Sequence, residues 1–341
     1  SRSWFDTLTT NGPFALSLSK GDGPGHFVTR SKGLLDSRFT THDSRLLWSN
    51  AAMKSSFKTV ALIGKYKSPE VAAPLLKLAR FLERRKVELL MDRIAGSRAG
   101  GGRYPVLPLE ELGRRADLAI VIGGDGTMLN IARTFAPHDV ALIGVNQGRL
   151  GFLTDISVET MIGTIGAILD GKFVTEKRML LEGRIRRRAQ KASRELAFND
   201  VVVSKGARGN MIELEVRIDG DFIYNQRSDG LIVATPTGST AYAMSAGGPI
   251  VHPALSVMAL VPVSPHTLSN RPIIVSSDSV VDVIIRSAAD PRVHFDGHTR
   301  FDLREGDCVT VRRYSHAVSL LHPAGHSYYT MLREKLNWNP E

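Results

Sequence analysis

The apolar residues of this chain follow two different periods, and the change between them constrains the fold more than any other feature. From residue 57 to about residue 145, short apolar runs alternate with segments of helical spacing. Phe57–Gly64, Leu118–Ile122 and Val140–Val145 have the length and composition of parallel strands buried on both faces. A further strand is expected at Val87–Met91. Helices are expected at Pro69–Arg85, Pro108–Arg115 and Thr127–Phe135. Strands that alternate with helices predict a doubly wound, Rossmann-like α/β domain.

After about residue 180, apolar and polar residues alternate. Met211–Ile218 alternates most clearly, and the Asp219-Gly220 pair that follows is a strong hairpin signal. Six further short strands are expected at Phe222–Gln226, Gly230–Ala234, Ile273–Ser276, Val280–Ile285, Val293–Asp296 and Cys308–Arg313. Short strands separated by turn residues predict a β-rich, sandwich-like second domain.

These patterns also suggest domain boundaries. Residues 1–52 are rich in Ser, Thr, Gly and Arg without a sustained period, so we expect a disordered extension. Met53 directly precedes the first strand, and we expect the functional protein to begin near it. The α/β domain is expected over 53–178 and the β-rich domain over 179–322. Residues 323–341 are expected to carry a helix, Tyr328–Leu336, that returns to the α/β domain.

Composition narrows the partners and the compartment. The formal net charge of +10 favours anionic partners such as nucleic acid, acidic membranes or phosphorylated metabolites. No apolar run reaches the ~20 residues that span a bilayer, so no membrane association is expected. The single cysteine, Cys308, cannot form an intramolecular disulfide and fits a reducing, cytoplasmic location. Its alternating surroundings predict a buried strand residue.

A glycine-rich loop, Gly123-Gly124-Asp125-Gly126-Thr127, directly follows the strand Leu118–Ile122. Glycines let phosphate oxygens approach the backbone amides, and a following helix N-terminus favours negative charge. The carboxylate of Asp125 would repel phosphate if anion binding were the only task. It suits a general base that takes a proton from a hydroxyl attacking a phosphoryl group. The alternative is a strand-to-helix turn in which Asp125 caps the helix.

The loop is neither a Walker A loop nor a dinucleotide fingerprint, because it lacks Gly-Lys-Ser/Thr and its glycines are spaced differently. GGDGT resembles the signature that NAD kinases, diacylglycerol-type lipid kinases and 6-phosphofructokinases share. That resemblance implies phosphoryl transfer and leaves the acceptor open.

Three polar segments of the second domain could choose the acceptor. Asn199-Asp200 offers an amide and a carboxylate, which suit paired ribose hydroxyls. Thr235–Tyr242 (TPTGSTAY) is a run of small and hydroxylated residues that ends in a ring able to stack on a base. Asp296-Gly297-His298 is a turn with one histidine. Each segment also has a purely structural interpretation. Asn199-Asp200 could be an ordinary turn, Thr235–Tyr242 a flexible surface loop, and His298 a solvated histidine.

Together these segments resemble bacterial-type NAD kinases over roughly residues 57–338. GGDGT, the Asn-Asp pair, the run from Arg227 to Pro253, the run Pro265–Pro272 and the Asp-Gly turn occur in the family's order. The resemblance implies that ATP phosphorylates NAD at the 2′-hydroxyl of its adenosine ribose and that Asp125 accepts the proton. Mg²⁺ would arrive with ATP, without a dedicated metal site in the protein. A homodimer or homotetramer is also implied.

The same resemblance implies a set of nucleotide- and substrate-binding residues: Gly124, Asp125, Gly126, Thr127, Asn199, Asp200, Asn210, Arg227, Asp229, Thr240, Ala241, Tyr242, Ala243, Met244, Ser245 and His298. His298 stands where many relatives have glutamine, which puts its contact in question.

Two other readings stay open. A diacylglycerol-type lipid kinase shares GGDGT but needs an apolar acyl site, whereas the second domain offers polar segments. A nucleic-acid-binding module is suggested by the basic run Arg184–Lys191, which lacks interleaved aromatic residues. A solvated or partner-facing edge accounts for this run better, so no nucleic-acid partner is expected. Arg133 and Arg149 are either cations that neutralise the triphosphate or ordinary surface charges.

Overall fold

The computed structural model describes residues 57–65, 69–98, 102–148, 150–187, 192–206, 210–267 and 269–338. The expected extension over residues 1–52 and the expected start at Met53 lie outside these residues. Among the helices described, none combines the length and apolar character needed to cross a membrane.

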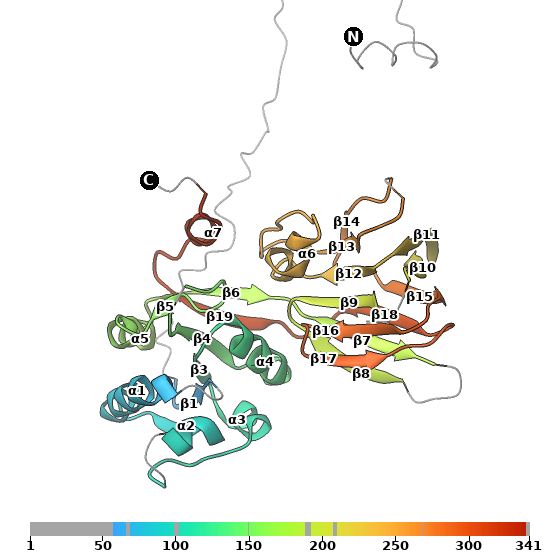
Figure 1. Ribbon diagram of the computed structural model, residues 1–341. Coiled ribbons are helices and arrows are strands. Elements are labelled where there is room, and N and C mark those ends of the chain that lie inside the picture. The colour runs from blue at the N-terminus through green and yellow to red at the C-terminus, as the bar shows by residue number, and fades with distance from the viewer. Residues whose placement is uncertain are drawn as a thin grey trace, which may run out of the picture. The chain divides into compact units, whose positions relative to one another are not determined.

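The first domain is built on a seven-stranded sheet in the order β2-β1-β3-β4-β19-β6, with β5 paired to β4 (Figure 1). The strands are β1 (Thr59–Gly64), β2 (Glu88–Met91), β3 (Leu118–Ile122), β4 (Ala141–Asn146), β5 (Ile156–Ser157), β6 (Phe173–Arg178) and β19 (Val318–Pro323). All pairings are parallel except that of β6 with β19.

Helices cover both faces of this sheet, as a doubly wound fold requires (Figure 1). Val60 and Leu62 of β1 pack with α1 (Ala72–Arg84) and α5 (Met161–Leu169). The alternate residues Ala61 and Ile63 point to the other face and pack with α3 (Leu109–Arg115) and α4 (Asp125–Phe135). Shorter helical segments lie at η1 (Pro69–Val71), α2 (Arg93–Arg98) and η2 (Ala136–His138).

The second domain consists of two six-stranded antiparallel sheets with a shared apolar core, which confirms the sandwich-like prediction. One sheet has the order β11-β10-β15-β18-β7-β8 and the other β14-β13-β12-β9-β16-β17. The strands of the first are β7 (Leu181–Arg186), β8 (Ser193–Ala197), β10 (Ile212–Ile218), β11 (Asp221–Ser228), β15 (Val281–Ser287) and β18 (Cys308–Arg313). Those of the second are β9 (Asp200–Lys205), β12 (Gly230–Ala234), β13 (Val257–Val263), β14 (Ile273–Ser276), β16 (Pro291–Phe295) and β17 (Thr299–Asp302).

The connections of this domain include the expected hairpin. Asp219 and Gly220 join β10 to β11 with φ angles of 54° and 91°, the pair of positive values that a type I′ turn requires. After β12 the chain forms η3 (Gly238–Thr240) and α6 (Tyr242–Ser245). The last helix is α7 (Tyr328–Leu336), whose Tyr328, Met331 and Leu332 pack with Phe152 and Ile250.

Three expectations are corrected. The chain returns to the first sheet before residue 323, because β19 pairs with β4 and β6. Helix α4 begins at Asp125 instead of Thr127, and its N-cap is Gly124, so Asp125 is not the capping residue. Cys308 lies in a strand as expected but is only half-buried, and burial raises the pKa of its thiol.

Candidate active site

The GGDGT loop turns sharply from β3 into α4. The amide of Gly123 donates to the carbonyl of Val145, which ties the loop to the neighbouring strand β4. A Cβ at Gly123 would lie 2.9 Å from Oγ1 of Thr127, so this glycine is required by packing. Gly124 and Gly126 have open space where a side chain would be. Their backbone is therefore accessible to a ligand at the N-terminus of α4.

The carboxylate of Asp125 is oriented by the segment after β4. Oδ2 accepts a hydrogen bond from the amide of Phe152 at 2.8 Å, and Oδ1 accepts from the amide of Leu153 at 3.1 Å. The hydroxyl of Thr154 also donates to Oδ1, at 3.1 Å. A Cβ at Gly151 would lie 2.0 Å from Oδ1 of Asp125, so Gly151 leaves the room that this carboxylate occupies. These hydrogen bonds fix the orientation of the carboxylate. Because Asp125 is only half-buried, its side chain stays accessible from solvent.

A cavity of about 290 Å³ opens beside the loop. Its lining residues are Ile63, Gly64, Lys65, Asp92, Ile94, Leu109, Gly126, Thr127, Asn130 and Ile131. Lys65, exposed at the end of β1, brings a cation to this cavity, and the sequence did not single it out. Asp92 brings a carboxylate that accepts from the amides of Gly64 and Ala95, and burial raises its pKa. Asp92 is the one carboxylate among the residues that line this cavity, and it could offer an oxygen to a phosphate-bound cation.

A second cavity, of about 410 Å³, lies in the β-rich domain. It brings together parts of all three segments that the sequence predicted, since Asn199 and Asp200 line it with Ala241 and Tyr242 and with Asp296 and Gly297. The Tyr242 ring is 46% exposed and available for stacking. Val202, Ser204 and His294 complete the lining. The volume, and the few polar groups in a largely apolar lining, suit part of a nucleotide.

Asp296 holds the Asn-Asp turn in place. Its carboxylate accepts the amides of Phe198, Asn199 and Asp200 at 2.9, 2.7 and 3.1 Å. The guanidinium of Arg133 from α4 forms an ion pair with the same carboxylate. Both expectations for Arg133 are therefore wrong, because this side chain is buried and bound within the protein. Arg149 lies outside the described residues.

Asp200 is the most perturbed acid of this cavity. Burial, and then the negative charge of Asp296, raise its pKa to about 7. Asp200 therefore changes its charge near neutral pH while it faces the space that a ligand would occupy.

Other predicted residues line neither cavity. Arg227 and Asp229 form ion pairs with Glu213 at 3.2 Å and with Lys205 at 2.7 Å. His298 is exposed, and Gly297 lines the cavity in its place. Gly124, Asp125, Asn210, Thr240, Ala243, Met244 and Ser245 also do not line the cavities, although Gly126 and Thr127 beside Asp125 line the smaller one. The roles of all these residues stay predictions.

The basic run that suggested nucleic-acid binding is paired within the sheet. Arg184 contacts Glu182, Arg186 contacts Asp282 and Arg187 contacts Asp307, at 2.6, 3.1 and 3.1 Å. Residues 188–191 of the run lie outside the described residues.

Known protein families match both domains. Residues 60–173 match the ATP-NAD kinase N-terminal domain, and residues 198–322 match the ATP-NAD kinase C-terminal domain. The chain is 58% identical to the NAD kinase of Nitrosospira multiformis over 287 residues, 84% of this chain and 98% of that protein. It is 56% identical to the NAD kinase of Nitrosomonas eutropha, over 83% of this chain and 96% of that protein.

Two solved structures of this kind of kinase are also similar to the chain. The NAD kinase of Archaeoglobus fulgidus in complex with ATP has a TM-score of 0.63 at 27% identity, covering 81% of this chain and 99% of that one. Yeast NADH kinase complexed with NADH has a TM-score of 0.77, covering 84% and 89%, and at 24% identity it supports the fold alone. These relatives do not favour the lipid-kinase alternative. With both family domains present in order and relatives above 50% identity over most of its length, the chain belongs to the ATP-NAD kinase family.

Proposed function

We propose that this chain transfers the γ-phosphoryl group of ATP to the 2′-hydroxyl of the adenosine ribose of NAD, giving NADP and ADP. Asp125 acts as the general base. The observation that carries this assignment is the orientation of its carboxylate by three donors at the mouth of an open glycine loop.

The hydrogen bonds of Asp125 leave room for one more partner. An ionised carboxylate offers about four lone-pair positions, and two amides and one hydroxyl occupy three of them. A ribose hydroxyl in the fourth would give up its proton to Asp125 as its oxygen attacks the γ-phosphorus. Because the carboxylate is already oriented, little reorganisation accompanies this step.

The smaller cavity supplies the groups that a triphosphate needs. Lys65 offers a cation, and Gly126 lies in the first turn of α4, whose N-terminus favours negative charge. We propose that Mg²⁺ enters with ATP and, when bound, neutralises phosphate charge. Asp92 is the carboxylate of this cavity that would hold it.

The larger cavity suits NAD better than a lipid. Asn199 and Asp200 offer an amide and a carboxylate to hydroxyl groups, and Tyr242 offers a ring to a base. An acyl chain would leave these polar groups without partners, which is unfavourable in a cavity. The names of the relatives, NAD kinases, agree with this choice.

The experiment is an acceptor comparison with the purified full chain. ATP and Mg²⁺ are supplied with NAD, NADH or diacylglycerol in vesicles, and phosphorylated products are separated and identified by mass. We expect NADP from NAD. Phosphate transferred only to the lipid would end the proposal.

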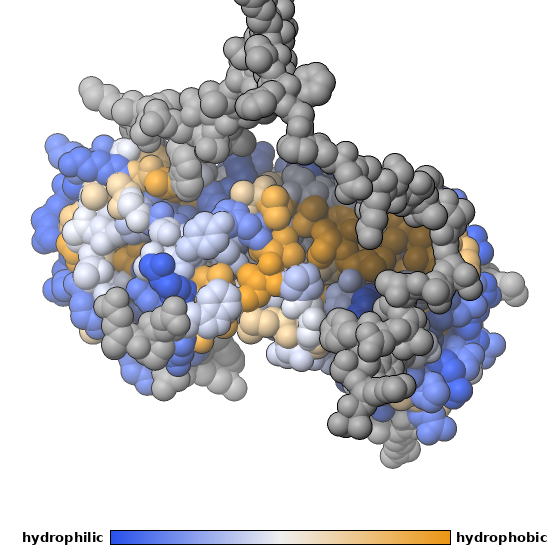
Figure 2. Space-filling view, turned by 90° about the horizontal axis from the view of Figure 1, so that it is seen from above, coloured by the Kyte–Doolittle hydropathy of each residue, from blue (hydrophilic) through white to orange (hydrophobic). Residues whose placement is uncertain are grey.

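We further propose a cytoplasmic homo-oligomer. Phe222 and Ile223 on β11 and Ile274 on β14 are 55%, 40% and 45% exposed, on the outermost strands of the two sandwich sheets. Figure 2 shows apolar surface gathered over the middle of one face, between hydrophilic ends. Exposed apolar edges favour association. Light scattering coupled to size exclusion should give a mass of two or four chains.

A further inference from the structure

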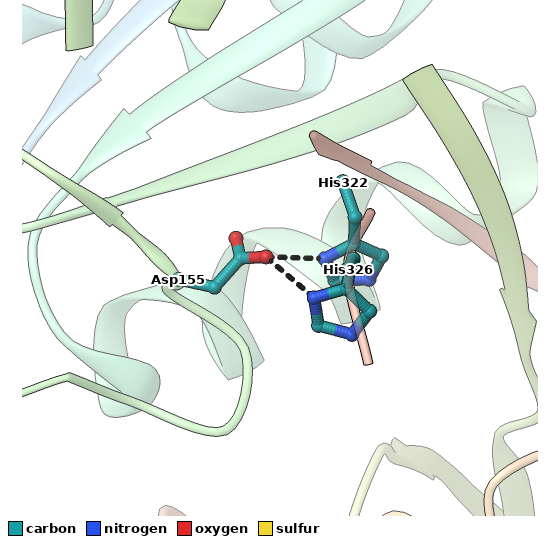
Figure 3. Close-up of side chains that lie close together, drawn as sticks. All are labelled: Asp155, His322 and His326. Carbon is teal, nitrogen blue, oxygen red and sulfur yellow. Dashed lines mark hydrogen bonds and ion pairs between the residues drawn. The ribbon is translucent and has the colours of Figure 1, made fainter. Parts of the chain in front are cut away.

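Two histidines, one buried and one mostly buried, meet one carboxylate in the first domain (Figure 3). His322 of β19 points its Nδ1 at Oδ2 of Asp155, at 2.8 Å. Nδ1 of His326 lies 3.0 Å from the same oxygen. The side chains of His322, Asp155 and His326 are 2%, 9% and 10% exposed.

These three residues form the kind of group that can bind a metal ion, since their ligand atoms all lie within 4.8 Å of one another. The rings, however, are stacked at 3.9 Å between centroids and 17° between planes. A ring nitrogen binds a metal at about 2.0–2.1 Å in the plane of its ring. Two stacked rings cannot both meet that condition at one ion, so the arrangement suits hydrogen bonding to Asp155.

His322 also reaches a second carboxylate. Its Nε2 lies 3.2 Å from Oε2 of Glu176, within ion-pair distance. With a carboxylate oxygen near each ring nitrogen, the surroundings of His322 favour a proton on both. The imidazolium and the guanidinium of Arg178 then balance Asp155 and Glu176.

The chain of contacts continues to the loop of the second cavity. Arg178, 2% exposed, donates to Oε2 of Glu176 at 2.7 Å and to Oγ1 of Thr237 at 3.1 Å. Thr237 begins the short run that leads through η3 to Tyr242. His322 is therefore linked through Glu176 and Arg178 to the segment that carries the stacking ring.

The other end of the chain leads to the proposed base. Asp155 directly follows Thr154, whose hydroxyl donates to Asp125. The segment from Phe152 to Asp155 is thus attached to Asp125 by its first three residues and to His322 by its last.

We propose that His322 is a positioning residue, which as an imidazolium holds both the segment that orients Asp125 and the loop that carries Tyr242. Only the kinetic consequences of this inference rest on the proposed function. The placement of the two segments can be measured without any substrate.

The surroundings of His322 favour the charged ring. The groups that face it are Asp155 before β5, Glu176 of β6 and His326 before α7. Arg178 of β6 pairs with Glu176, and Tyr328 of α7 lies near both of these residues. Burial lowers the pKa of His322, but hydrogen bonds and charge from Asp155 and Glu176 raise it above its usual value. Burial also opposes ionisation of Glu176, yet His322 and Arg178 bring its pKa down to about 2.

The test compares His322→Asn with His326→Asn. An asparagine at 322 can still donate to Asp155, but it has no charge and does not reach Glu176. His326 contacts the same oxygen of Asp155 but is not part of the link to Arg178, which makes it the matched control. We expect hydrogen–deuterium exchange in His322→Asn to accelerate at least tenfold in both 151–155 and 235–242, and to change little in His326→Asn.

Kinetics provide the second measurement. His322→Asn should lower kcat for NADP formation about tenfold, raise KM for NAD, and remove the alkaline fall in kcat/KM that accompanies deprotonation of His322. A loss of thermal stability with an unchanged pH profile and unchanged exchange in the two segments would overturn the proposal. An inactive wild type whose His322 variant still shows the two exchange changes would refute the proposed function and leave the positioning role intact.

Thr237→Val gives an independent check if His322→Asn does not fold. It removes only the last contact of the chain. Exchange should then accelerate in 235–242 and not in 151–155. Equal acceleration in both segments, or in neither, contradicts the proposed link.

Discussion

Two carboxylates of this protein, Asp125 in the first domain and Asp296 in the second, are held by backbone amides but have different surroundings. Asp125 accepts two amides and one hydroxyl, is half-buried and borders accessible backbone. Asp296 accepts three amides and an ion pair from Arg133, and its side chain is 0% exposed. The first can still accept a proton from a ligand, whereas the second is saturated. Asp125 is therefore suited to react with a ligand, whereas Asp296 holds the backbone of the second cavity in place.

Asp125→Asn is expected to have the largest effect on turnover. The amide keeps the shape and can accept at one oxygen, but it cannot take a proton and it faces the Phe152 amide with a donor. Removal of a general base lowers kcat by about 10²–10⁴-fold. Steady-state kinetics with ATP and NAD, and calorimetric titration of NAD, should show low turnover with little change in affinity. Near-normal kcat would assign the base elsewhere.

Asp296→Asn is expected to act mainly on stability. Arg133 is 9% exposed and would be left with a buried charge and no carboxylate. Removing one partner of a buried ion pair destabilises by about 3–5 kcal/mol. Urea unfolding measures this loss, and Asp125→Asn is the matched control because it removes a carboxylate that has no cation bound to it in the contacts described above. Equal losses in the two variants would erase the distinction between the two carboxylates.

Gly151→Ala tests whether the orientation of Asp125 matters. The added Cβ would lie 2.0 Å from Oδ1 of Asp125 and 2.2 Å from Oγ1 of Thr154, so the carboxylate must move. A misplacement of about 1 Å can lower the rate by about 10²-fold. Gly163→Ala in α5 meets open space and should leave kcat unchanged. If both variants keep the wild-type kcat, the fixed geometry of Asp125 is not needed for turnover.

Local patterns predicted most of the fold. Strands β3, β12, β14 and β18 and helix α7 begin and end where the sequence indicated, because each has a clear period and turn residues at its ends. Strands β5, β6, β7, β8, β13, β17 and β19 were not predicted. The place of β19 in the first sheet, for example, depends on pairing with β4 and β6, far away in the chain. No local period carries that information.

The site was predicted less completely than the fold. The Asn-Asp pair and Tyr242 do meet in one cavity. The Asp296 turn was noticed, but its histidine was chosen as the ligand, whereas the carboxylate organises the neighbouring backbone. The sequence did not mark Lys65 as a site residue, because a single lysine after a strand is common. Only the position of α4 brings Lys65 close to Gly126 and Thr127 of the GGDGT loop.

Asp200→Asn is expected to have the smallest effect, and it concerns pH. The folded-state pKa of about 7 lies above the ~3.9 of an unfolded aspartate, so the folded protein binds the proton more tightly. The stability that this proton contributes is therefore fully present below about pH 4 and is lost as pH rises through 7. A tenfold difference in proton affinity between the folded and unfolded states corresponds to about 1.4 kcal/mol. Urea unfolding from pH 5 to 8 should show a decline in the wild type that is weaker in Asp200→Asn.

If Asp200 accepts a hydrogen bond from a ribose hydroxyl, the affinity for NAD should rise with pH, whereas the stability falls. The carboxylate forms as pH rises through 7, and an ionised acceptor makes a stronger hydrogen bond than a protonated one. Affinity for NAD, measured by calorimetry at pH 6 and pH 8, should therefore increase several-fold in the wild type and stay flat in Asp200→Asn. A wild type whose affinity does not change with pH would show that Asp200, like Asp296, shapes the cavity without accepting from the ligand.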